Sequence, residues 1–161
     1  MGVHHEVDLL PDIDFGVGDQ KTHFVPKHGF YAVHHWGEDS PQENPVLVLD
    51  DAAVFEGDAS GDAGRKEGPV YEALPGRITA VPTGRVFVRF AKSVSANSRE
   101  FSIRNAGYEI VQQPAWAPHT AWVEAITGDV IESLRNMYRL RQIKEVENVE
   151  PQMLMPAATR A

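Results

Sequence analysis

The second half of the chain has the more regular pattern of apolar and polar positions. Residues 85–90 alternate, with Val86, Val88 and Phe90 on one face, which predicts a half-buried strand. Three more strands are predicted downstream, over residues 108–113, 120–126 and about 144–153. Two helices are predicted between them, one from Ser95 or Asn97 to about Ala106 and one over about residues 130–140.

Helix start and stop signals support these boundaries. Gly107 is the residue type expected just after a helix, where the backbone adopts a left-handed conformation. Asp129 is placed to cap the second helix at its N-terminus. Ile131, Leu134 and Met137 or Tyr138 then give that helix an apolar stripe that can pack on a sheet.

The first half of the chain shows weaker periodicity. Residues 1–22 have no sustained pattern and are interpreted as an extended arm. Strands are predicted within residues 23–35 and over residues 45–50, and residues 53–55 are a candidate continuation beyond Asp50 and Asp51. Residues 57–68 contain four glycines and both charge signs, which indicates a surface loop.

The order strand, helix, strand, strand, helix, strand predicts an α+β fold class with a ferredoxin-like C-terminal domain. The expected division is a mostly β or irregular segment over residues 1–77 and a ferredoxin-like domain over residues 78–161. Right-handed crossovers would place both helices on one face of the sheet. The other face would then be open to a cover or to a partner.

Composition limits the classes of function. The 161 residues include no cysteine, which excludes disulfides, thiolate nucleophiles and cysteine-based zinc sites. The net charge of −8 argues against nucleic acid as a partner, and no apolar run approaches membrane-spanning length, so no membrane partner is expected. The N-terminus has no secretory signal pattern; if it is native, a cytoplasmic protein is expected.

Charge is divided unevenly between the two halves. Residues 1–77 carry 15 acidic and 5 basic side chains, a balance of −10, whereas residues 78–161 carry 8 acidic and 10 basic ones, a balance of +2. Such an asymmetry indicates segments with different roles. For residues 1–77 three interpretations stay open: an independent small β unit, an extension of the C-terminal sheet, or a second interaction surface.

Candidate sites for catalysis, metals and cofactors have simpler explanations. The seven histidines lack helical ligand spacing, so surface or hydrogen-bonded histidines are expected and no metal site is predicted. Asp58 to Gly64 lacks the register of a calcium loop. No Gly-x-Ser-x-Gly elbow occurs, and Trp116 and Trp122 are expected to be core residues rather than a ligand pocket. We therefore expect no cofactor and no enzymatic activity.

Four features resemble the propeptides of subtilisin-like serine proteases. They are the Val-x-Val-x-Phe pattern at residues 86–90, Ala-Gly-Tyr at residues 106–108, a helix centred on Leu134, and Val-Glu-Asn-Val-Glu-Pro at residues 146–151. The last is the most specific. The resemblance covers residues 78–161 and leaves residues 1–77 unassigned.

The resemblance implies a partner, a subtilisin-like serine protease, bound as an inhibitor or folding chaperone. In that family the open sheet face packs on two protease helices, acidic side chains cap those helices, and the segment after the last strand fills the substrate cleft. Glu147 or Glu150 would be the capping residue, and Met155 and Ala158 would lie near the specificity subsites. The implied protease-binding residues are Glu147, Glu150, Met153, Met155, Ala157, Ala158, Thr159 and Arg160.

The chain has none of the sequence blocks that carry a subtilisin-like catalytic triad. It is expected to be either a stand-alone inhibitor or chaperone or a propeptide separated from its enzyme. A second hypothesis is a non-catalytic structural or regulatory protein-interaction domain.

Overall fold

The structure is a computed structural model that describes residues 10–15, 21–37, 44–61 and 65–156. The chain forms two compact units. The first contains Met1–Thr83 and Met153–Ala161, and the second contains Gly84–Gln152. Each unit is described by itself below.

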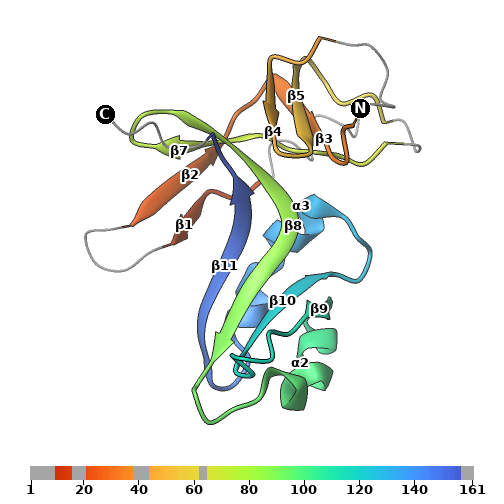
Figure 1. Ribbon diagram of the computed structural model, residues 1–161. Helices are drawn as coiled ribbons and strands as arrows, with labels where there is room; N and C mark the ends of the chain where they lie inside the picture. Colours follow the sequence, from red (N-terminus) through yellow and green to blue (C-terminus); the bar gives the residue numbers. More distant parts are fainter. Residues whose placement is uncertain (1–9, 16–20, 38–43, 62–64, 157–161) are drawn as a thin grey trace. The chain divides into compact units, whose positions relative to one another are not determined.

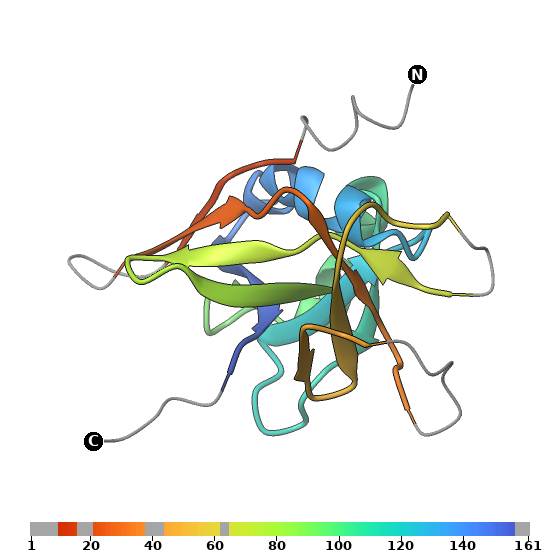
Figure 2. The same ribbon diagram turned by 90° about the horizontal axis from the view of Figure 1, so that it is seen from above.

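The first unit consists of β-strands. They are β1 (Ile13–Phe15), β2 (Thr22–Pro26), β3 (Phe30–Val33), β4 (Leu47–Leu49), β5 (Ala52–Glu56), β6 (Glu67–Gly68), β7 (Tyr71–Leu74) and the start of β8 (Ile78–Phe90). β1, β2, β7 and β8 pair in that order, all antiparallel. A separate four-stranded antiparallel sheet has the order β4-β5-β3-β6 (Figure 1; Figure 2).

β5 is buried on both faces, so its sequence shows no alternation of apolar and polar residues. Ala52 and Val54 join one apolar cluster with Ala32, Leu49, Val70 and Val81, and Leu154 packs against it. Ala53 and Phe55 join a second cluster, in which Phe55 contacts the rings of Tyr31 and Trp36. Successive side chains of a strand point to opposite faces, which explains the two clusters.

β4 and β5 form a hairpin, although the sequence suggested one strand that continues past two aspartates. Leu49 lies opposite Ala52, so Asp50 and Asp51 are the two turn residues. Asp50 has a φ of 54°, the left-handed conformation that tight hairpin turns require and that aspartate tolerates better than most residues.

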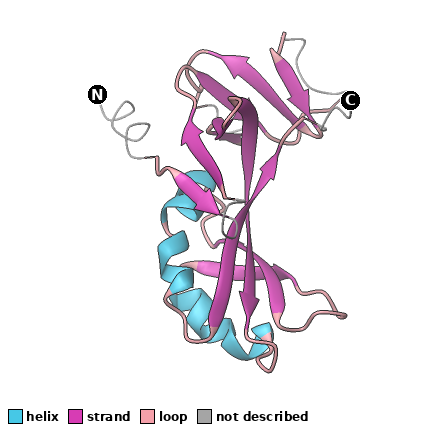
Figure 3. Ribbon diagram, turned by 90° about the vertical axis from the view of Figure 1, so that its left-hand side faces the viewer, coloured by secondary structure: helices cyan, strands magenta, loops and turns pink. Residues whose placement is uncertain are grey.

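The second unit contains strands and four short helical segments. Its elements after β8 are η2 (Ala96–Arg99), α2 (Glu100–Asn105), β9 (Tyr108–Gln112), β10 (Thr120–Ala125), α3 (Val130–Arg135), α4 (Met137–Arg141) and β11 (Val146–Leu154). The strand order is β9-β10-β8-β11. Figure 3 shows the helices, in cyan, along one side of these strands.

One face of this sheet supplies the core of the second unit. Val86, Val88 and Phe90 are completely buried, whereas Arg85, Phe87 and Arg89 on the opposite face are not. β10 follows the same rule, with Ala121, Val123 and Ala125 buried. The helices contribute one or two apolar anchors each, namely Ile103, Val130, Leu134, Met137 and Leu140. The alternation in residues 85–90 therefore predicted the buried face correctly.

The helix ends were largely predictable. Asp129 caps α3, and its carboxylate accepts a hydrogen bond of 3.0 Å from the backbone N–H of Ile131. Gly107 follows α2 with a φ of 96°, as expected of a C-terminal stop. Ser95 precedes the first helical segment, but its side chain makes no capping hydrogen bond.

Two buried polar bonds tie α3 to the sheet. The Ser133 hydroxyl donates to the Gly84 carbonyl at 2.6 Å, and the Tyr108 hydroxyl donates to the Ser133 carbonyl. Gly84 has a φ of 94°, and a Cβ atom added there would lie 3.3 Å from a methyl group of Val130. Position 84 therefore requires glycine for two reasons: its φ is positive, and a side chain there would lie too close to Val130.

The predicted α+β, ferredoxin-like fold class is wrong. The chain is mostly β, with 44% strand and 16% helix in two antiparallel sheets. The predicted strand at residues 85–90 begins at Ile78 instead, so β8 has 13 residues and also pairs with β7. Through β8 the larger sheet reaches seven strands, and no helix in the described chain exceeds six residues.

Substitution of Leu140 tests whether the helical segments contribute to the core of the second unit. We expect Leu140→Ala to lower the free energy of unfolding by about 2–5 kcal/mol, because it leaves a cavity under α4. Phe101→Ala is the control, since the Phe101 side chain is largely exposed and its removal should change stability by about 0.5 kcal/mol or less. Urea unfolding followed by circular dichroism measures both. Equal effects would contradict the packing described here.

Candidate functional site: a groove between the helical segments

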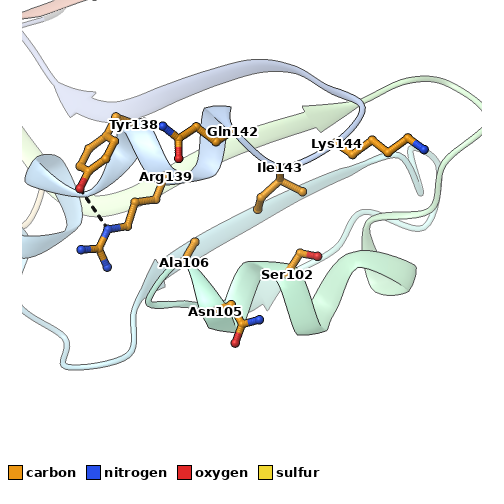
Figure 4. Close-up of a pocket in the computed structure, with 8 residues that line it drawn as sticks. All are labelled: Ser102, Asn105, Ala106, Tyr138, Arg139, Gln142, Ile143 and Lys144. Atoms are coloured by element: carbon orange, nitrogen blue, oxygen red, sulfur yellow. Dashed lines mark hydrogen bonds between the residues drawn. The ribbon is translucent and has the colours of Figure 1, made fainter.

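A groove of about 580 Å³ lies on the helical side of the second unit. We call it the helix groove. Figure 4 shows the residues that line it: Ser102, Asn105, Ala106, Tyr138, Arg139, Gln142, Ile143 and Lys144. The first three come from α2 and its C-terminal cap, and the others from α4 and the residues that follow it. Six of the eight are polar or charged.

Burial of neighbouring positions holds the two walls in place. Ile103 on α2 and Leu140 on α4 are fully buried, which fixes the rotation of each helix. Ser102 and Asn105 flank Ile103 along α2, and Arg139 and Gln142 flank Leu140 along α4. The polar lining is thus a consequence of how the apolar anchors are placed.

One exposed aromatic side chain lines the groove. Tyr138 is 49% exposed there. Phe101 on α2 is 77% exposed but is not among the lining residues. Aromatic residues with this exposure are uncommon on surfaces that serve only to contact water.

Arg139 is held by the neighbouring tyrosine. Its Nε donates a 3.2 Å hydrogen bond to the Tyr138 hydroxyl oxygen, and its guanidinium carbon lies 5.8 Å from the centre of that ring. The hydrogen bond and the field of Tyr138 raise the pKa of Arg139 above its ordinary value. The two Nη groups of Arg139 stay available to a ligand that carries a carboxylate or carbonyl oxygen.

The groove contains two cations and none of its lining residues is acidic. The nearest carboxylates in sequence have other partners. Glu145, next to Lys144, pairs with Arg99, and Glu100 pairs with Arg104 at 3.8 Å. The groove is therefore a site of positive potential with hydrogen-bonding amide and hydroxyl groups.

Comparison with known proteins identifies no relative. No family model, no curated protein and no solved structure matches the chain. The assignment of a function therefore depends on the geometry and chemistry of the chain itself.

None of the described residues implied by the propeptide resemblance lines the helix groove. Glu147 is exposed and pairs with Arg89 at 3.8 Å, and Glu150 is partly buried. Met153 is partly buried, and Met155 is 44% exposed. Ala157, Ala158, Thr159 and Arg160 lie outside the described residues. Of the groove residues, Tyr138 was expected on the apolar stripe of the second helix but is 49% exposed, and no binding role was predicted for any of them.

The tryptophans, expected in the core, differ from each other. Trp122 packs edge-on against Phe87, with ring centres 5.2 Å apart on the sheet face opposite the helices. Trp116, between β9 and β10, is 87% exposed. The core interpretation is therefore wrong for Trp116, because the connection in which it lies projects this residue into solvent.

The part of the chain that the structure describes contains no group of three or more histidine or acidic side chains that could hold a metal ion. Within the candidate calcium loop, Ser60 and Gly61 instead bond to the Glu67 carboxylate. Among the described helices, none combines the length and apolar character of a membrane span.

His34 is the exceptional histidine. It is buried in the first unit, and its backbone N–H donates to the Lys66 carbonyl at 2.8 Å. Burial lowers the pKa of His34 to about 4, with further lowering by the charges of Lys66 and His35 and an opposing effect of Asp51. Such a group is neutral in the folded protein at neutral pH, which suits a structural position.

His34 predicts a dependence of stability on pH. Its folded pKa of about 4 lies below the ordinary value of 6.5, so the unfolded chain binds the proton more readily. Stability should therefore fall as the pH drops from about 6.5 toward 4, by about 3 kcal/mol at most. We expect His34→Gln to flatten this part of the curve of unfolding free energy against pH.

The matched control is His28→Gln, because His28 is exposed on the same unit. That variant should keep the slope of the wild-type protein. An unchanged slope in His34→Gln would show that other groups cause the acid sensitivity.

Proposed function

We propose that the protein is a non-catalytic binding module that holds a peptide segment of another protein in the helix groove. The observation that carries this proposal is the half-exposed aromatic side chain of Tyr138, which holds Arg139 in an open groove with a polar lining. Binding energy at protein interfaces is concentrated in aromatic residues and arginine. The groove has both, with Arg139 already oriented by Tyr138.

The lining favours a peptide over a small apolar ligand. Sites for small molecules are mostly apolar and enclose their ligand. Here Ala106 and Ile143 are the only apolar residues in the lining, and the polar lining residues include the side-chain amides of Asn105 and Gln142. Side-chain amides bond equally well to backbone N–H and C=O groups, which every peptide offers.

The groove does not favour a catalytic role. Ser102 is the residue there with a nucleophilic hydroxyl of the kind enzymes activate, and no histidine or carboxylate is among the lining residues. A serine nucleophile needs an adjacent base. A binding function requires no such group.

A peptide library tests the proposal. Random short peptides displayed on phage are selected on the full chain, and each selected peptide is then measured against variants. We expect Tyr138→Ser to weaken peptide binding at least tenfold, as removal of an aromatic anchor does. Trp116→Ser is the matched control, because Trp116 is an exposed aromatic residue that is not part of the groove. Selected peptides that bind Tyr138→Ser as well as wild type would refute the groove as the binding site.

The protease-binding hypothesis is a second proposal. The observation in its favour is the exposure of Glu147 on β11 and of Met155 directly after it, where the chain leads to the implied cleft-binding segment. Against it stands the fold, because the ferredoxin-like domain that the resemblance implied is not the fold class of the chain.

Residual activity of a panel of subtilisin-like proteases tests this second proposal. We expect the full chain to lower the activity of at least one protease. A chain that lacks residues 155–161 should not do so, since that segment would occupy the substrate cleft. The Tyr138→Ser variant should inhibit as well as wild type, which separates the two proposals. No inhibition by the full chain at any concentration would refute protease binding.

A further inference from the structure

We infer that the helix groove selects an acidic peptide, with carboxylates at its two ends and an apolar side chain between them. This inference rests on the proposed function and adds the chemistry of the partner. It is argued from the distribution of charge on the helical segments and from the arrangement of the lining.

The helical side of the second unit is cationic although the whole chain has a net charge of −8. Residues 96–105 and 130–145 contain six basic side chains and three acidic ones, which gives +3. The basic residues are Arg99, Arg104, Arg135, Arg139, Arg141 and Lys144. The local charge is therefore opposite in sign to that of the chain.

All three acidic side chains in these segments have partners outside the groove. Glu145 pairs with Arg99, Glu100 pairs with Arg104, and the Glu132 carboxylate accepts a 2.7 Å hydrogen bond from Thr127. No described carboxylate lies within 4.0 Å of the charged groups of Arg139 or Lys144. The charge of Glu132 acts on Arg139 from beyond this distance, so a ligand carboxylate would add to it at Arg139 and would supply the counter-charge at Lys144.

The positions of the two cations define the pattern of the ligand. Figure 4 shows Arg139 and Lys144 toward opposite ends of the groove, with Ile143 between them and facing Ala106. A peptide along the groove would place one carboxylate at each end and an apolar side chain near Ile143. Arg139 suits a carboxylate with fixed geometry, because the Tyr138 hydroxyl already holds its guanidinium, whereas Lys144 acts as a mobile point charge.

The test uses the library selection with a charge-reversed double variant, Arg139→Glu with Lys144→Glu. The wild-type chain should enrich peptides with two acidic residues that flank an apolar one, and it should bind them roughly tenfold more weakly when both cations are reversed. The double variant should enrich basic peptides instead. The control is Arg135→Glu with Arg141→Glu, which makes the same change of charge at exposed helix positions outside the lining.

The outcomes separate this inference from the proposal beneath it. Acidic enrichment that is lost in the groove variant and kept in the control supports the inference. Selected peptides that depend on Tyr138 but show no acidic enrichment overturn it and leave the proposed function standing. Peptides with no dependence on Tyr138 overturn both. Tighter binding of poly-uridine or of a phosphorylated peptide than of poly-glutamate, measured by fluorescence anisotropy, also overturns the inference.

Discussion

Burial of one face of the β9-β10-β8-β11 sheet is the constraint on which the second unit depends. Val86, Val88 and Val123 are completely buried on this face, and the helical segments reach the core through a few apolar anchors. The segments are too short to be stable helices alone, because helix nucleation in water is unfavourable. Their geometry must therefore come from packing, and the groove between α2 and α4 exists only while Ile103 and Leu140 stay buried.

Hydrogen bonds in the core restrict this packing to one arrangement. Ser133 donates to the Gly84 carbonyl and its own carbonyl accepts from Tyr108, so α3 is joined to β8 and to β9. Buried polar groups are costly unless they are paired, so alternative packings of α3 that break these bonds are disfavoured. α4 follows α3 directly after Asn136. Fixing the position of α3 therefore also limits the positions open to α4, which carries Tyr138 and Arg139 on one wall of the groove.

The parts of the structure that depend on local pattern could be predicted from the sequence. β9 and β10 begin at the expected residues, and Asp129 caps α3 as its position indicated. The parts that depend on distant pairing could not. Pro82 and Gly84 suggest a break, yet β8 runs through both because β7 pairs with its first half, Ile78 to Ala80.

The groove was missed for the same kind of reason. Its walls come from segments about 37 residues apart in sequence, around Asn105 and Gln142, and neither has a motif. Its aromatic residue, Tyr138, fits the apolar stripe of the predicted helix, yet the structure leaves this side chain 49% exposed. An exposed aromatic cannot be told from a buried one by sequence when the helix has five residues, because the apolar period is too short to establish. Whether this aromatic side chain is exposed depends on how the helix packs in the folded protein.

Charge shows how the overall composition can mislead about a site. The net charge of −8 suggests a chain that repels acidic partners, and residues 1–77 carry the acidic excess. At physiological ionic strength, however, charges separated by more than about 8 Å are largely screened. A bound ligand therefore experiences chiefly the side chains in and around the groove, where Arg139 and Lys144 have no acidic neighbour in the lining. The relevant quantity for recognition is the net charge of residues 96–105 and 130–145. It is +3, opposite in sign to the net charge of the chain.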